Sequence, residues 1–114
     1  MSSISPGTPN AKVPQIFQRL AAQGQSPTLR RTNGSYEVDI VDGGQWFVEL
    51  VDGRPTIREK IEHPDCALTF DATDFIDIAE GRRNLVTTFL QGRMGFSGDL
   101  AFALTFRRLV PVAA

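Results

Sequence analysis

Along residues 35–70 the apolar side chains recur at every second position, so a strand would place them on one face and the polar side chains between them on the other. The stretch over residues 36–40 shows this alternation clearly. Clusters of turn-forming residues separate the alternating stretches. The pattern predicts strands over residues 35–41, 45–51, 54–61 and 66–70. They would form a sheet with one apolar face and one polar face, apart from Phe47 and Val51 on the polar side.

Two hairpins connect the first three predicted strands. Asp52-Gly53 is a strong signal for a two-residue turn, and a three-residue loop over 42–44 suits the earlier hairpin. A slip of one residue there would turn Asp39 toward the apolar face, so we exclude it. The predicted partners are Leu50 with Pro55 and Val48 with Ile57 in the later hairpin, and Ile40 with Trp46 and Val38 with Val48 in the earlier one.

After residue 70 the apolar spacing changes to three and four positions, which is typical of helices. Asp71 and Asn84 stand at N-cap positions, and Gly81 and Gly92 stand where helices would end. The predicted helices cover residues 72–80, 85–91 and 100–109, with an earlier helix at 14–22 and a fifth strand at 93–97. Residues 1–12, rich in Ser and Pro, are expected to be a disordered tail, and residues 13–114 to form one domain.

The last predicted helix carries more apolar side chains than a surface helix needs. Between Leu100 and Phe106 only Thr105 is polar. A helix on the surface of a small sheet buries a single stripe, whereas a helix that is apolar all round needs two apolar neighbours. One neighbour is the sheet. The second could be the preceding helices, another copy of the chain, or an apolar ligand.

Composition excludes several classes of function. One histidine and one cysteine are too few for an ordinary zinc site or an internal disulfide, and we expect neither metal nor cofactor. A net charge of −1 does not indicate a positively charged surface for binding nucleic acid. The apolar run over residues 84–106 is interrupted by polar and glycine residues, so no transmembrane segment is predicted. We expect a cytoplasmic protein in which Cys66 is a buried, unreactive thiol and His63 lies at the surface.

The order and spacing of several segments resemble the sterol carrier protein 2 family. These segments are Trp46 to Gly53, Cys66 to Phe70, Asp74 to Gly81 and Phe89 to Leu100. The resemblance implies an α+β fold, with a five-stranded, mainly antiparallel sheet, helices packed on one face and an apolar tunnel between the layers. It implies a tunnel lining of Trp46, Phe70, Phe75, Ile76, Ala79, Phe89, Leu90, Met94, Phe96, Leu100 and Leu104. Phe102 and Phe106 depart from the family pattern and are expected to narrow the cavity.

A member of this family is expected to bind and carry a lipid, a fatty acyl chain or an isoprenoid or sterol-like molecule. Two other functions stay open from the residues alone. One is a small biosynthetic enzyme or accessory protein acting on an apolar metabolite, for which Asp99 and Tyr36 are the first candidates, although no catalytic motif is present. The other is an oligomeric interaction module. A monomer or a dimer, and a transient contact with a membrane, are both compatible with the sequence.

Overall fold

A computed structural model describes the backbone of residues 9–112 and the side chains of residues 12–112. The helices are α1 (Pro9–Ala22), α2 (Ala72–Ala79), α3 (Leu85–Leu90) and α4 (Leu100–Thr105), with the short 3-10 turns η1 (Pro27–Leu29) and η2 (Phe106–Arg108). The strands are β1 (Gly34–Val41), β2 (Gly44–Val51), β3 (Arg54–Arg58), β4 (Cys66–Asp71) and β5 (Gly95–Gly98). The expected α+β fold with five strands is confirmed.

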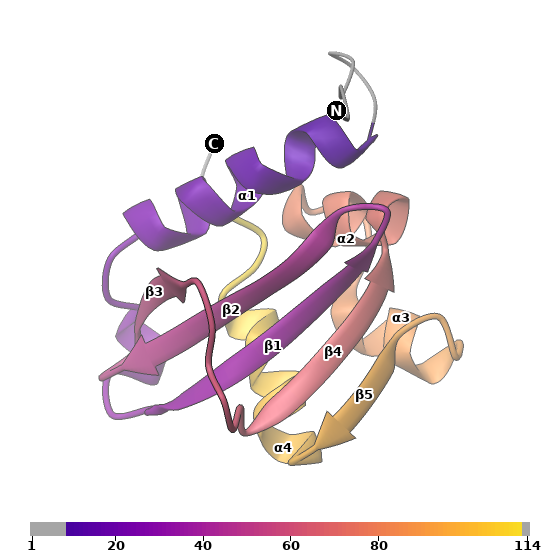
Figure 1. Cartoon of the computed structure of the whole chain (residues 1–114). Helices are drawn as coiled ribbons and strands as arrows, with labels where there is room; N and C mark the ends of the chain where they lie inside the picture. The colour runs from indigo at the N-terminus through magenta and orange to yellow at the C-terminus, as the bar shows by residue number, and fades with distance from the viewer. Residues whose placement is uncertain (1–8, 113–114) are drawn as a thin grey trace.

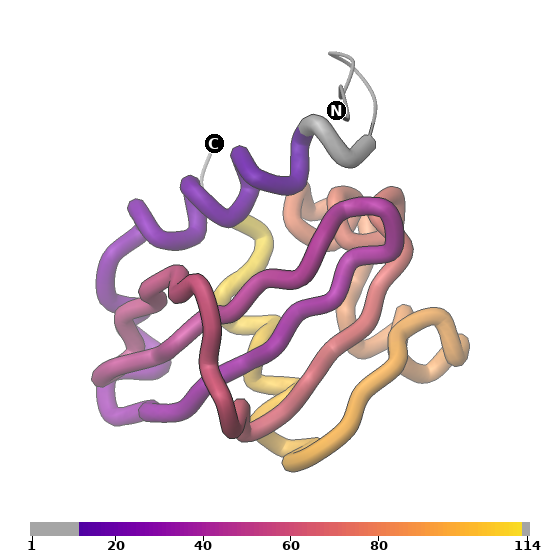
Figure 2. Tube along the Cα trace, viewed as in Figure 1, coloured from indigo at the N-terminus to yellow at the C-terminus, as the bar shows by residue number. Residues whose placement is uncertain are grey.

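The five strands form one mixed sheet in the order β3-β2-β1-β4-β5. Three of its four pairings are antiparallel, and only β1 and β4 run parallel. In the view of Figure 1, α2, α3 and α4 lie behind the sheet, and the connection from β3 to β4 crosses in front of β2 and β1. The tube in Figure 2 follows the same crossing. Within residues 9–112, one face therefore packs against helices and the other is crossed by this connection.

The later hairpin has the predicted register, with Leu50 opposite Pro55. In the earlier hairpin the predicted partners are wrong by two residues, because Val38 faces Trp46 rather than Val48. Its turn is tighter than expected, since the Gly43 N–H donates to the Ile40 carbonyl at 2.8 Å. A shift of two residues leaves every side chain on its predicted face. The apolar pattern thus determined the faces but not the length of the turn.

Helix α1 begins at Pro9, five residues before the predicted start at Pro14. Pro14 lies inside the helix, where it lacks one backbone donor. The earlier start lets Val13, which is fully buried, extend the apolar stripe of the helix. Residues 9–12, which we expected to belong to a disordered tail, lie within α1. The rest of that expected tail, residues 1–8, lies outside the described residues.

The caps of the C-terminal helices follow the sequence in part. The Asn84 side chain caps α3 by accepting the Thr87 N–H at 3.0 Å. Asp71 occupies the N-cap of α2 but makes no capping hydrogen bond with its side chain. Three further predicted elements have bounds that differ by more than one residue. The third strand ends at Arg58, the fifth runs from Gly95 to Gly98, and the last helix tightens into η2 from Phe106 onward.

Candidate apolar ligand site

The interior between the helices and the sheet brings together most of the predicted lining residues. Five of them are buried to 5% exposure or less, namely Phe70, Phe75, Ile76, Ala79 and Met94. Three are partly buried and pack against the same core, namely Trp46, Phe89 and Leu104. The remaining three are exposed, namely Leu90, Phe96 and Leu100. The residues therefore form an apolar layer that is closed on one side and reaches the surface on another.

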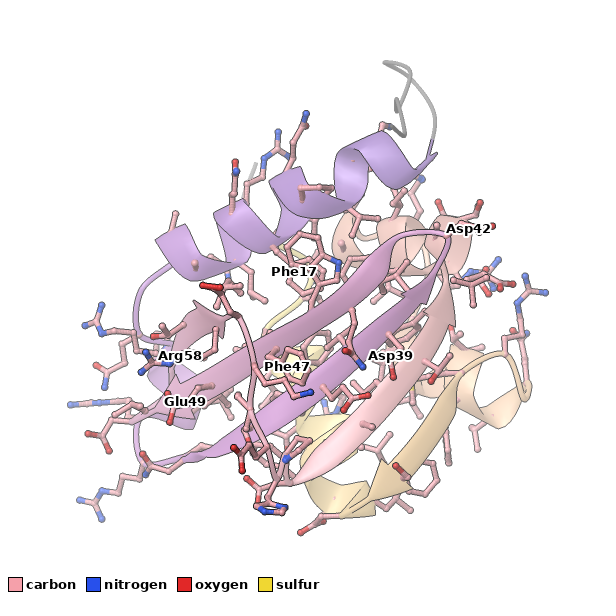
Figure 3. All side chains as sticks on the ribbon, in the orientation of Figure 1. Phe17, Asp39, Asp42, Phe47, Glu49 and Arg58 are labelled. Carbon is pink, nitrogen blue, oxygen red and sulfur yellow. The ribbon has the colours of Figure 1, made fainter. Side chains whose placement is uncertain are left out.

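Stacked rings fill the part of this layer beneath α1. Phe17 from α1 lies between Trp46 and Phe75, with ring centroids 4.5 and 5.2 Å away and nearly parallel planes. Phe70 continues the row at 5.6 Å from Phe75. Figure 3 shows Phe17 pointing from α1 toward the sheet. The Trp46 indole N–H donates to the Gly43 carbonyl at 2.8 Å, so the ring and the N–H group of this side chain both have partners in the protein.

A second aromatic cluster fills the centre of the layer. Phe102 from α4 stacks on Tyr36 at 4.3 Å, and Phe106 meets the same ring edge-on at 5.0 Å. The fully buried Tyr36 hydroxyl donates to the Phe102 carbonyl at 2.9 Å. Burial raises the pKa of the Tyr36 phenol above its ordinary value near 10. The two aromatic departures from the family pattern thus occupy space beside Tyr36.

Both candidates for catalysis make hydrogen bonds within the protein. Tyr36 is inaccessible and uses its hydroxyl within the protein. The Asp99 carboxylate caps α4 by accepting the Phe102 N–H at 3.0 Å. Both side chains therefore have structural roles that account for their positions.

The apolar layer reaches the surface where α3, β5 and α4 meet. Phe96 pairs with Leu68 on the helix-facing side of the sheet, yet it is 39% exposed because β5 is an edge strand. The Phe89 ring of α3 meets the Phe96 ring edge-on at 5.5 Å. Leu100, at the start of α4, is 41% exposed, and Leu90, at the end of α3, is 76% exposed. We call Phe89, Leu90, Phe96 and Leu100 the β5 edge.

Sequence reasoning missed an ion pair in which a buried carboxylate meets a half-exposed arginine next to this layer. Asp74 of α2 is 2% exposed and accepts two hydrogen bonds from the Arg93 guanidinium, each of 3.0 Å. Arg83 lies 3.5 Å from the same carboxylate. These three side chains line part of a hollow of about 560 Å³. The only signal was the basic residue in the segment before the last helix, and nothing in the sequence indicated its partner.

Cys66 and His63 lie in the surroundings expected for them. Cys66 is a free, buried thiol, and burial raises its pKa to about 12. His63 is exposed. Among the residues that the structure describes, no group of His, Cys, Asp or Glu is arranged to hold a metal ion. No helix within residues 9–112 is both long enough and apolar enough to cross a membrane.

The sheet order and the helices on one face of the sheet define an α+β fold that can be compared with known proteins. The sequence matches the model of the SCP-2 sterol transfer family over residues 14–111, so the chain belongs to that family. It is 25% identical over 101 residues to sterol carrier protein 2 of Gallus gallus. That match covers 83% of this chain but 18% of the relative, so the chain corresponds to a small part of that protein.

Solved structures share the fold at lower identity. Palmitated SCP2L2 from Aedes aegypti matches with a TM-score of 0.65 and 22% identity, over 85% of this chain and 88% of that one. The sec-alkylsulfatase Pisa1 from Pseudomonas sp. matches with a TM-score of 0.73 and 19% identity, over 94% of this chain and 17% of that one. The fold therefore makes up most of the palmitated SCP2L2 chain and a small part of the sulfatase chain.

Proposed function

We propose that this protein binds and carries an apolar small molecule, such as a fatty acyl chain or an isoprenoid or sterol-like lipid, which enters at the β5 edge. Family membership supports a lipid-binding domain, and the carrier role and the entry point are our inference. In this proposal the ligand lies between the helices and the sheet, with Phe96 and Leu100 at the mouth and Met94 and Leu104 further in.

The exposed apolar side chains at the β5 edge carry this proposal. Large apolar side chains gathered from three elements around one edge are typical of binding sites, because leaving them in water is costly. The rest of the layer is already filled, by Phe17 and Trp46 on one side and by Phe102 on Tyr36 in the centre. The β5 edge is thus the part of the layer where a ligand chain gains most by covering exposed apolar surface.

The energetics suit a carrier. Burying about twelve methylenes at about 0.8 kcal/mol each gives roughly 10 kcal/mol, and association costs at least about 4 kcal/mol. The difference of at most about 6 kcal/mol corresponds to a dissociation constant of tens of micromolar or weaker. Such binding depends little on polar contacts, so we expect several chain-like ligands to compete for the same site.

Displacement of a fluorescent fatty acid tests the site. We expect saturable binding to the unmodified protein, weakened about tenfold or more by Phe96→Ser, because the mouth then loses a large apolar surface. Val41→Ser is the matched control. Val41 is similarly exposed but lies on β1, away from the β5 edge, so this variant should bind as the unmodified protein does. Equal weakening by both substitutions, or no saturable binding at all, would contradict the proposal.

A further inference from the structure

The arginines of this chain divide into two groups. Four have carboxylate partners within 4.0 Å, namely Arg58, Arg82, Arg83 and Arg93. Figure 3 shows one of these pairs, Arg58 beside Glu49. The other six have no ion pair with any described residue, namely Arg19, Arg30, Arg31, Arg54, Arg107 and Arg108. The chain has thirteen Asp and Glu residues, so this separation is not caused by a shortage of acids.

Four of the arginines without partners gather at one end of the molecule. Arg30 and Arg31 line a hollow of about 620 Å³, and Arg108 lines a second hollow of about 320 Å³. The two hollows share Gln25 and Pro27 and therefore adjoin. Arg54 belongs to the same end. Its guanidinium lies beside Gly24, 3.6 Å from where a side chain at that position would begin, and Gly24 lines the second hollow. We call Arg30, Arg31, Arg54 and Arg108 the arginine end.

One carboxylate faces this concentration of positive charge. Among the described residues that line the two hollows, Asp52 is the only acidic one. It belongs to the turn between β2 and β3, where its backbone N–H donates to the Asn33 side chain at 3.0 Å and its carboxylate accepts from the same amide at 3.5 Å. With four guanidiniums against one carboxylate, this end is positive on a molecule whose formal net charge is −1.

We propose that the arginine end docks on the phosphate groups of an anionic lipid bilayer. Guanidinium groups bind phosphate oxygens through paired hydrogen bonds, and all four side chains are exposed and come from three separate segments. This spread suits a surface that presents many phosphates. A single free phosphate in such an open, wet hollow would meet strong screening. Single-stranded nucleic acid is disfavoured, because none of the described residues that line the two hollows is aromatic and could stack on a base.

Membrane docking by the arginine end rests on the proposed function, because a lipid carrier exchanges its ligand with membranes. Its test, vesicle binding, is separate from the ligand-binding test. The measurement is co-sedimentation with vesicles of phosphatidylcholine, with and without phosphatidylglycerol. We expect binding only to the anionic vesicles, lowered by added salt. The double variant Arg30→Gln/Arg31→Gln should bind about 10-fold to 30-fold more weakly, at about 1 kcal/mol for each basic residue near the surface.

The matched control is Arg58→Gln/Arg82→Gln, which lowers the formal net charge from −1 to −3 as the first double variant does but leaves the arginine end intact. It should bind anionic vesicles as the unmodified protein does. An equal loss in both double variants would reduce the effect to net charge and overturn the proposal. Saturable binding of inorganic phosphate or of duplex DNA without vesicle binding would also overturn it. Displacement of the fluorescent fatty acid in solution should be unchanged in both variants, so failure here is distinguishable from failure of the proposed function.

Discussion

Tyr36 and Cys66 are neighbours across β1 and β4 and are both buried in their neutral forms. Burial raises the pKa of the Cys66 thiol from an ordinary value near 9 to about 12, and it raises that of the Tyr36 phenol as well. Each residue type can act in catalysis, yet the surroundings of both favour the form that is a poor nucleophile or base. Tyr36 and Cys66 therefore serve as buried core side chains rather than as reactive groups.

These buried groups predict a loss of stability at alkaline pH. A group whose pKa is raised by folding stabilises the folded state fully below its ordinary pKa, and that contribution is lost as the pH rises. The free energy of unfolding should thus fall from about pH 9 upward, by about 1.4 kcal/mol per pH unit for the thiol. Urea titrations over a series of pH values measure this. Cys66→Ala should flatten the decline just above pH 9, and an unchanged decline in that variant would contradict the assignment.

The elements around β5 depend on connections that are distant in sequence. Gly98 ends β5 with φ at +91°, and a Cβ there would lie 2.5 Å from the Asp65 carbonyl oxygen. This close approach lets the Asp99 N–H donate to the same carbonyl before α4 begins. Just before the other end of β5, Arg93 pairs with the buried Asp74 of α2. The β5 edge is thus held at both ends by polar contacts rather than by a covering layer.

The Asp74–Arg93 contact predicts a specific loss of stability. Asp74→Asn keeps the shape of the side chain but removes the charge that receives two hydrogen bonds, so we expect a cost of about 1.5–3 kcal/mol in the free energy of unfolding. Asp77→Asn is the control in the same helix, because Asp77 pairs with the exposed Arg82 and should matter little. Urea denaturation of both variants measures the difference. Equal stability of the two variants would show that burial of Asp74 does not strengthen its contact.

The sequence predicted the elements better than their ends and partners. Alternation of apolar residues determined which face of β1 and β2 is buried. A shift of two residues preserves that face, so the alternation could not prevent the wrong partner predicted for Val38. Asn84 could be predicted as a cap because its partner is three residues away. The pairing of Asp74 with Arg93, nineteen residues apart, could not, since it depends on how α2 and β5 pack. For the same reason the exposure of Leu90 could not be predicted from its apolar side chain.

The molecule has three surfaces of different polarity in different places. One face of the sheet is polar and carries the β3–β4 connection, the β5 edge exposes apolar side chains, and the arginine end concentrates positive charge. The layer between the helices and the sheet is filled by aromatic rings at α1 and around Tyr36, which leaves the β5 edge as the proposed entry for a ligand. Composition alone indicated none of this, because a net charge of −1 averages over charges that the fold separates.

The most direct test of the account is native mass spectrometry of the purified protein, followed by organic extraction of whatever it retains. The account predicts an apolar molecule bound at about one per chain, or one taken up on incubation with fatty acids, and reduced retention in Phe96→Ser. A bare protein mass after both purification and incubation, with the protein folded, would contradict a lipid-binding interior at the β5 edge.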